Sequence, residues 1–276
     1  MKKAITSICA VLAAAFSLQA HDGNFPVDSM LNPSMGYLHA SASVGFESQY
    51  VFRGEKIDNY SIQPQVELMY PIAGFDITAG AWYNAPLYGS KYGDISELDL
   101  YADAAYKFDA FTVKAGYIYY WDTSGVPANA YASTMEVYGG VSMDTSSYIG
   151  YNINPSVFYF YDWILKQQTV ELSFSYEFPV GELLMGWSRL TLPVGIYGGY
   201  VSSGNKNKDG QGISYFYYGA QADLAYQLTD YCVISGGVRW SQRNGGQDFD
   251  YRDLRQYPIG GAESNIWFGG RISFGF

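Results

Sequence analysis

Apolar and polar side chains alternate, residue by residue, along most of this chain. In Thr169–Val180 one set of alternate positions is apolar and the other is polar. The apolar set is Val170, Leu172, Phe174, Tyr176 and Phe178, and the polar set is Glu171, Ser173, Ser175 and Glu177. A period of two places these sets on opposite faces of a β-strand. Such a strand needs a neighbour on each side and an apolar environment over one face, as in a transmembrane β-barrel.

The alternation recurs in segments of about 9–11 residues or slightly more, the length that one strand needs to cross a membrane. We count about twelve such segments, an even number, as in bacterial barrels. They span Ala40–Phe52, Ser61–Ile72, Phe75–Leu87, Ile95–Phe108, Phe111–Trp121, Thr134–Met143, Asn154–Tyr161, Thr169–Val180, Arg189–Ser202, Ser214–Leu228, Val233–Gln242 and Asn265–Phe276. The sequence therefore predicts an all-β fold: a transmembrane antiparallel up-and-down β-barrel of about twelve strands, within a range of about ten to fourteen.

The links between these segments alternate in length. Those after Ile72, Phe108 and Leu228 are tight. The links 53–60, 86–94, 122–133, 202–212 and 243–264 are longer and polar. Outer-membrane barrels have short periplasmic turns and long extracellular loops, so we expect both termini on the periplasmic side. The longest link, 243–264, is expected either to fold into the barrel mouth or to remain a surface loop.

The N-terminal segment predicts export from the cytoplasm. A basic start, an apolar run from Ile5 to Phe16 and a small residue at Ala20 form the pattern of a secretory signal peptide. We therefore expect a leader over 1–20, a short periplasmic segment over 21–37 and the barrel over 38–276. Outside the leader Cys232 is the only cysteine, so an internal disulfide is excluded.

Charge and aromatic content narrow the partners. The formal net charge of −10 argues against a nucleic acid partner, which needs a basic face. Aromatic side chains near strand ends predict the two interface belts of a protein surrounded by outer-membrane lipid and lipopolysaccharide. The expected belts are Tyr70, Phe75, Phe108, Phe111, Phe178 and Phe276 at the short-turn ends, and Tyr50, Phe52, Tyr83, Trp121 and Trp240 at the loop ends.

Two resemblances support an outer-membrane protein. Ser43–Gly54, Glu97–Tyr106 and Met135–Met143, with the glycine- and tryptophan-containing segment Thr78–Asn84, resemble the Gcw_chp-type family of bacterial outer-membrane proteins of unknown function. The resemblance covers about the first half of the predicted barrel and implies its fold and location, but no substrate. The terminal Phe276 also resembles the C-terminal signature that the barrel-assembly machinery recognises, which implies that machinery as a partner during biogenesis.

The polar faces of the predicted strands would line the barrel interior, and they are rich in charge. The charged candidates are Glu47, Arg53, Glu67, Asp76, Glu97, Asp99, Asp103, Lys114, Glu136, Glu171, Arg189, Asp223, Arg239, Arg243 and Arg271. Interior rings are expected at Trp82, Tyr101, Tyr120, Tyr138, Tyr197, Tyr215, Tyr217 and Trp267. Twelve strands enclose more space than eight, whose inner side chains simply fill the barrel. These residues favour a narrow porin-like channel for small polar solutes, neutral or cationic, with sugars and nucleosides as examples.

Two alternatives remain open at this stage. The interior charges could pair and close the lumen, which would leave a structural or adhesive barrel. A hydrolase embedded in the barrel is the other, but its general base is usually a histidine. His21 and His39 both precede or begin the first strand, far from the loop rim, and are expected to be solvent-exposed. We therefore predict no enzymatic activity, no catalytic residues, no metal site and no cofactor.

Overall fold

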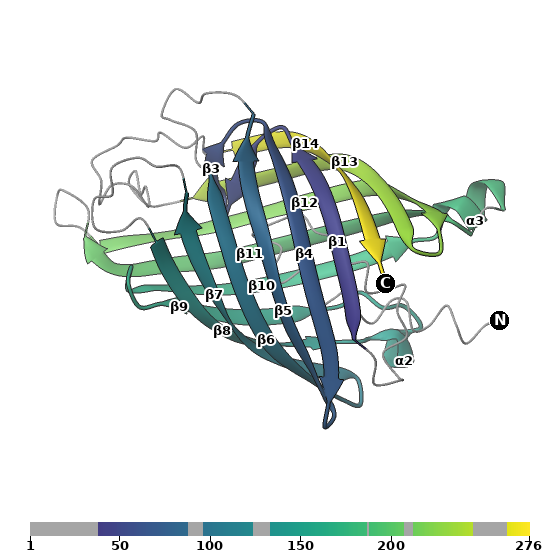
Figure 1. The fold of residues 1–276 in the computed structure, drawn as a ribbon, viewed down its shortest axis with the longest axis horizontal. Coiled ribbons are helices and arrows are strands. Elements are labelled where there is room, and N and C mark those ends of the chain that lie inside the picture. The colour runs from purple at the N-terminus through teal and green to yellow at the C-terminus, as the bar shows by residue number, and fades with distance from the viewer. Residues whose placement is uncertain (1–37, 88–95, 124–132, 187, 207–211, 245–263) are drawn as a thin grey trace.

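In the computed structural model, the described residues are 38–87, 96–123, 133–186, 188–206, 212–244 and 264–276. Twelve strands form one closed antiparallel barrel in the order β1-β14-β13-β12-β11-β10-β9-β8-β7-β6-β5-β4 (Figure 1). Their bounds are β1 His39–Glu47, β4 Ser61–Ile72, β5 Phe75–Pro86, β6 Glu97–Phe108, β7 Phe111–Asp122, β8 Ser133–Met143, β9 Ser156–Asp162, β10 Gln167–Phe178, β11 Leu190–Lys206, β12 Gly212–Thr229, β13 Cys232–Asn244 and β14 Ser264–Gly275. The predicted fold class is confirmed, and most strand ends agree with the sequence pattern to within a few residues.

The last strand closes the barrel against the first. In the antiparallel register of β1 and β14, Ser41 pairs with Gly275 and Glu47 pairs with Gly269. The other edge of β1 pairs with β4, where Glu47 lies opposite Ser61. Each of the twelve barrel strands therefore has two neighbours, so closure removes the two open edges that a flat sheet would have.

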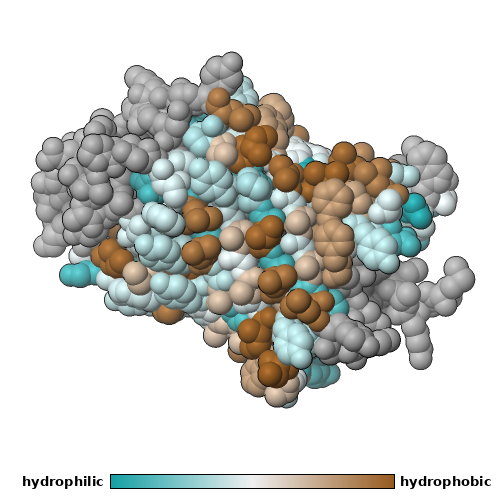
Figure 2. All heavy atoms as spheres, in the orientation of Figure 1, coloured by the Kyte–Doolittle hydropathy of each residue, from teal (hydrophilic) through white to brown (hydrophobic). Residues whose placement is uncertain are grey.

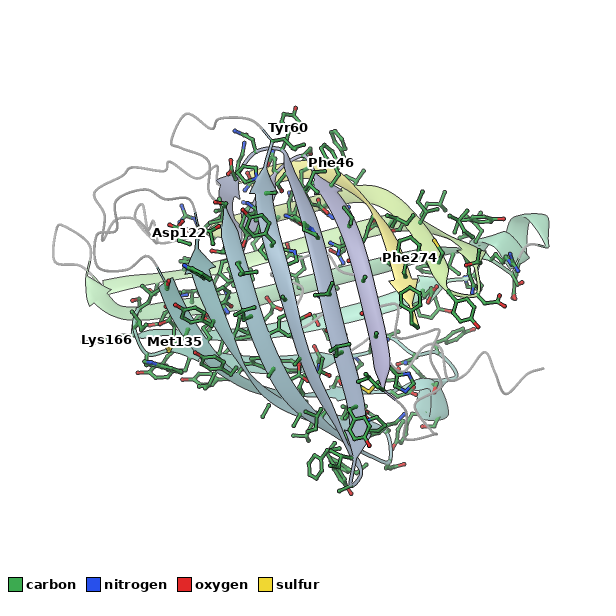
Figure 3. The ribbon with its side chains drawn as sticks, in the orientation of Figure 1. Phe46, Tyr60, Asp122, Met135, Lys166 and Phe274 are labelled. Carbon is green, nitrogen blue, oxygen red and sulfur yellow. The ribbon has the colours of Figure 1, made fainter. Side chains whose placement is uncertain are left out.

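The two faces of the wall differ as the alternation requires. On β10 the side chains of Val170 and Leu172 are exposed, whereas those of Thr169, Glu171 and Ser173 are buried. Apolar spheres spread over the outer wall in Figure 2, which is the surface that lipid would cover. Aromatic rings also pack on this outer surface, and Phe46 on β1 stacks against Tyr60 with ring centroids 6.2 Å apart (Figure 3).

The tight links and two short helices lie at the end of the barrel where β1 begins and β14 ends (Figure 1). Ala73-Gly74 joins β4 to β5, with positive φ at both residues, as a two-residue hairpin turn requires. At the same end α2 (Ser146–Ile149) joins β8 to β9, and α3 (Val180–Met185) joins β10 to β11. No helix among the described residues has the length and apolar character needed to cross a membrane.

One prediction about the first strand is wrong. The sequence pattern extended it over 40–52, but β1 ends at Glu47, and Ser48 and Gln49 form a bend. Tyr50–Phe52 then forms β2, which pairs with β3 (Glu55–Asp58) in a separate two-stranded sheet. We call residues 48–60, which include both short strands, the inner hairpin.

Candidate functional site in the barrel interior

The inner hairpin lies across the lumen, because it contacts inward-facing side chains from most of the circumference. On one side Tyr50 packs on Trp82 of β5 at a centroid distance of 5.5 Å, and its hydroxyl donates to Glu97 of β6 at 2.9 Å. Beyond β1, the side-chain amide of Asn265 on β14 donates to the backbone carbonyl of Gly54 at 3.5 Å. Tyr50 and Phe52 are therefore buried inside the barrel, and their predicted place in the outer aromatic belt is wrong.

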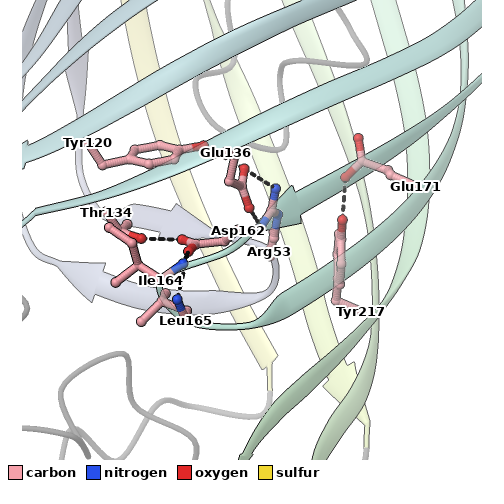
Figure 4. A network of polar contacts seen from close by, with 9 residues as sticks. All are labelled: Arg53, Tyr120, Thr134, Glu136, Asp162, Ile164, Leu165, Glu171 and Tyr217. Carbon is pink, nitrogen blue, oxygen red and sulfur yellow. Dashed lines mark hydrogen bonds and ion pairs between the residues drawn. The ribbon is translucent and has the colours of Figure 1, made fainter.

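Arg53 at the hairpin tip forms an ion pair with the barrel wall. Its guanidinium donates two hydrogen bonds to the carboxylate of Glu136 on β8, at 2.7 and 2.9 Å (Figure 4). The hydroxyl of Tyr120 on β7 donates to the same carboxylate at 2.9 Å. The guanidinium carbon also lies 4.6 Å from the ring centroid of Phe52 and 4.9 Å from that of Phe160 on β9. Both charged side chains are buried, so the pair is shielded from bulk water.

A second ion pair holds the other strand of the hairpin. Glu55 on β3 accepts a hydrogen bond from the guanidinium of Arg243 on β13, and both side chains are buried. Between the two ion pairs, the ring of Phe52 packs against Tyr120 at a centroid distance of 6.3 Å. The hairpin is thus anchored to β8 at its tip and to β13 on its return strand.

The hairpin turn is built for a close approach to the wall. Arg53 and Gly54 have φ values of +47° and +82°, the left-handed pair of a type I′ turn. A Cβ atom on Gly54 would lie 2.7 Å from the Cβ of Tyr217 on β12, so only glycine fits against that strand. The tip therefore reaches the far side of the lumen.

A further group of interior charges belongs to the wall alone. The guanidinium of Arg239 on β13 lies 3.3 Å from Glu47 of β1 and 3.2 Å from Asp223 of β12. On the other side of the barrel, Lys114 of β7 lies 3.4 Å from Asp103 of β6. Pairing of interior charges was one of the alternatives that the sequence left open.

Inward-facing tyrosines form a repeated pattern with glycine and a carboxylate. Tyr138 on β8 lies over Gly116 on β7, and its hydroxyl donates to Asp103 on β6 at 2.9 Å. The three residues are register partners in one row across three strands. The same arrangement occurs in the rows Glu67, Gly80, Tyr101 and Glu171, Gly199, Tyr217. This pattern was missed in the sequence because it depends on strand register.

Most of the predicted interior residues face inward. Those that are buried on the inner face of the wall are Glu47, Asp99, Asp103, Glu136, Glu171, Asp223, Arg239, Arg243 and Arg271. Those that are partly buried there are Glu67, Glu97 and Lys114. Arg53 is buried on the inner hairpin and not on the wall. Arg189 was wrongly placed inside: its side chain is 52% exposed and lies 4.0 Å from the exposed Asp230. His39 is buried at the start of β1, so its predicted exposure is also wrong.

Some predictions fall on residues that the structure does not describe. The leader 1–20, the segment 21–37 and residues 245–263 of the longest link lie outside the described ranges. It is the first long link, in the hairpin of residues 48–60, that folds into the mouth in the structure. Within the described residues, no three histidine, cysteine, aspartate or glutamate side chains group as metal ligands would.

Comparison with known proteins identifies the fold only. No family model matches the chain, so the resemblance to the Gcw_chp-type family is not confirmed, and no curated protein matches. Among solved structures, the COG4313 outer membrane channel from Pseudomonas putida F1 aligns with a TM-score of 0.54 and 10% identity, over 89% of this chain and all of that chain. The NanC porin aligns with a TM-score of 0.46 and 12% identity, over 85% of this chain and 98% of that chain. The KdgM porin aligns with a TM-score of 0.45 and 10% identity, over 86% of this chain and 99% of that chain. The chain therefore has the fold of outer-membrane β-barrels.

Proposed function

We propose that this protein is a narrow outer-membrane channel for small polar solutes, constricted by the inner hairpin. The observation that carries the proposal is the hairpin itself, which occupies a twelve-stranded barrel whose wall is polar and charged on the inside. In this proposal both termini face the periplasm, lipid and lipopolysaccharide cover the outer wall, and the barrel-assembly machinery inserts the chain. The lumen-facing residues named above line the path that solute takes when the hairpin is displaced.

The nature of the interior favours a channel over a purely structural barrel. Buried ion pairs add little net stability compared with well-packed apolar side chains, because each charge loses its hydration. The pairs Arg53–Glu136 and Arg239–Glu47 are therefore poor choices for a lumen that only needs filling. Groups of this kind suit an interior that water and solute enter in another state.

The charge balance favours cations and neutral polar solutes over anions. Among the predicted lining residues, acids outnumber bases. The acids are Glu47, Glu67, Glu97, Asp99, Asp103, Glu136, Glu171 and Asp223, and the bases are Arg53, Lys114, Arg239, Arg243 and Arg271. A carboxylate-rich wall lowers the energy of a cation in a narrow, low-dielectric passage and raises that of an anion. Hydroxyl-bearing neutral solutes such as sugars and nucleosides would use the inward tyrosines and carboxylates as hydrogen-bond partners.

The test uses a variant without the hairpin. Because Glu47 lies directly opposite Ser61, residues 48–60 can be replaced by a two-residue Asn-Gly turn without altering either strand. In planar bilayers we expect this variant to conduct severalfold more than the wild type and to prefer K⁺ over Cl⁻. Heat-modifiable migration in a detergent gel, which only folded barrels show, verifies assembly. A folded variant that conducts no ions would reject the channel and leave the structural or adhesive barrel.

A further inference from the structure

The wall side chains around Arg53 form a complete environment for a planar organic cation. Glu136 supplies both carboxylate oxygens, at 2.7 and 2.9 Å from the two guanidinium nitrogens. Tyr120 donates to that carboxylate at 2.9 Å and orients it. Phe160 presents its ring 4.9 Å from the guanidinium carbon. These three side chains belong to the wall strands β7, β8 and β9 and not to the hairpin.

The geometry selects guanidinium-type heads over ammonium ions and over metal ions. Two parallel N–H···O bonds need a planar fork of donors, which an ammonium group lacks. An aromatic ring facing the cation favours a delocalised, weakly hydrated charge. Metal ions are bound by several oxygen ligands, whereas here one carboxylate is combined with an aromatic ring.

The position of Arg53 in the turn also indicates that this side chain is present for its contacts with the wall. The two central residues of a type I′ turn have positive φ, and Asn-Gly and Asp-Gly are the residues that adopt it with least strain. Arginine in the left-handed region is destabilised by about 1–2 kcal/mol. A turn residue chosen for local stability would not be arginine, so the side chain at position 53 is explained by what it contacts on the wall.

Two further acidic residues lie on the strands that flank this site. Asp99 is on β6, next to β7, and Glu171 is on β10, next to β9. Both carboxyl groups are buried on the inner face of the wall. If the Arg53 side chain left, the buried carboxylate of Glu136 would lose its counter-charge, and a solute cation would be drawn to it.

We infer that Glu136, Tyr120 and Phe160 form a recognition site for small solutes with a guanidinium-type head, and that Arg53 occupies this site from the hairpin. The inference rests on the proposed channel function and names the solute class of the same lumen. An incoming solute of this class competes with Arg53 for Glu136. Displacement removes the anchor of the hairpin tip and opens the path that the hairpin obstructs.

The experiment removes the Arg53 side chain and offers free guanidinium ion in its place. The variant Arg53→Gly removes the side chain and suits the left-handed turn position, so the hairpin backbone is retained. In planar bilayers it should conduct more than the wild type. Guanidinium chloride at about 5 mM, in the range of a weak millimolar site, should reduce that current by about half or more. Urea, a neutral isostere, and additional NaCl should not reduce it.

The matched control is the double variant Arg53→Gly/Glu136→Gln. It should conduct but lose the block by guanidinium, because the amide cannot accept two charge-assisted bonds. Equal block in both variants, or no block in Arg53→Gly, would overturn the recognition site while the conductance itself still supports the channel. Absence of conductance in folded Arg53→Gly and in the folded hairpin-free variant would instead reject the channel. If Arg53→Gly does not assemble, Arg53→Ala is tested in the same way.

Discussion

Tyr217 donates a hydrogen bond of 2.6 Å to Glu171 from two strands away, and its ring crosses Gly199 on the strand between them. The three residues share one row of the sheet. The glycine matters because a Cβ atom there would lie 2.5 Å from the hydroxyl oxygen of the tyrosine. Three rows of this kind tie neighbouring strands together from the inside, which explains part of the unusual glycine and tyrosine content of the chain.

The first prediction concerns this row. Gly199→Ala should destabilise the barrel by about 1–3 kcal/mol, the usual effect of an extra group in a packed interior, because the Tyr217 ring must move away from Glu171. Gly198→Ala is the matched control on the adjacent, outward-facing position, where a Cβ would make ordinary contacts at 3.5 Å. Urea unfolding in lipid vesicles, followed by tryptophan fluorescence, measures both. Equal unfolding midpoints for the two variants would show that the row does not contribute to the stability of the barrel.

The second prediction concerns the anchor of the hairpin. In the wild type Arg53 is buried in its ion pair with Glu136, so trypsin should not cleave the chain after Arg53. Glu136→Gln leaves a buried guanidinium without its counter-charge, a change that destabilises by about 3–5 kcal/mol in other proteins. We therefore expect the hairpin to leave the lumen and trypsin to cleave after Arg53 or Lys56 in intact vesicles.

Mass spectrometry of the fragments identifies those cleavage sites. The control is Glu177→Gln. It removes an acid near the end of β10 that leads into α3. Resistance of the Glu136→Gln variant to trypsin, in a barrel still accessible from the loop side, would mean that other contacts alone hold the hairpin.

The third prediction concerns ion selectivity. Arg239 lies between Glu47 and Asp223, and Arg239→Gln would leave both carboxylates without this counter-charge. The reversal potential across a KCl gradient should therefore shift further toward the K⁺ equilibrium value. Arg189→Gln removes the same charge from an exposed position and should leave the reversal potential unchanged. A shift toward Cl⁻ in Arg239→Gln would contradict the assignment of these acids to the solute path.

The fourth prediction tests the orientation of the wall. In a Cys232→Ser background, which removes the free buried thiol, a bimane label at Leu100→Cys should be quenched by lipid-borne quenchers, because this side chain is exposed on the outer wall. Asp99→Cys, one residue earlier, should resist labelling by a water-soluble maleimide until the hairpin is removed, because the side chain is buried inside. Lipid quenching at position 99 would mean that the register is wrong by one residue.

The sequence pattern predicted the wall well because lipid and lumen impose opposite polarities on alternate residues. It failed at Tyr50 and Phe52, which continue the even-numbered apolar phase of β1. Alternation cannot distinguish an aromatic ring that faces lipid from one that packs on Trp82 or Tyr120 inside the barrel. The polar pair Ser48-Gln49 and the Arg53-Gly54 turn are the only local signals that the chain leaves the wall there.

The candidate site was predicted as a set of residues but not as an arrangement. Arg53 and Glu136 both appeared among the interior charges, yet nothing in the spacing paired them. Their contact depends on the barrel curvature and on the inward direction of the hairpin, which place residues 83 positions apart within hydrogen-bond distance. The exposure of Arg189, just before β11, likewise depends on where the strand begins, which alternation locates only to within a few residues.

The position of the hairpin also sets an order of events during biogenesis. Glu55 contacts Arg243, 188 positions later, and Gly54 contacts Asn265, 211 positions later. These partners arrive with the final strands, and contacts of such long range form slowly. The contacts of the hairpin with β13 and β14 can therefore form only once these two strands have joined the sheet. A chain whose barrel closes before the hairpin has made these contacts would have a wall of correct shape around an unobstructed lumen.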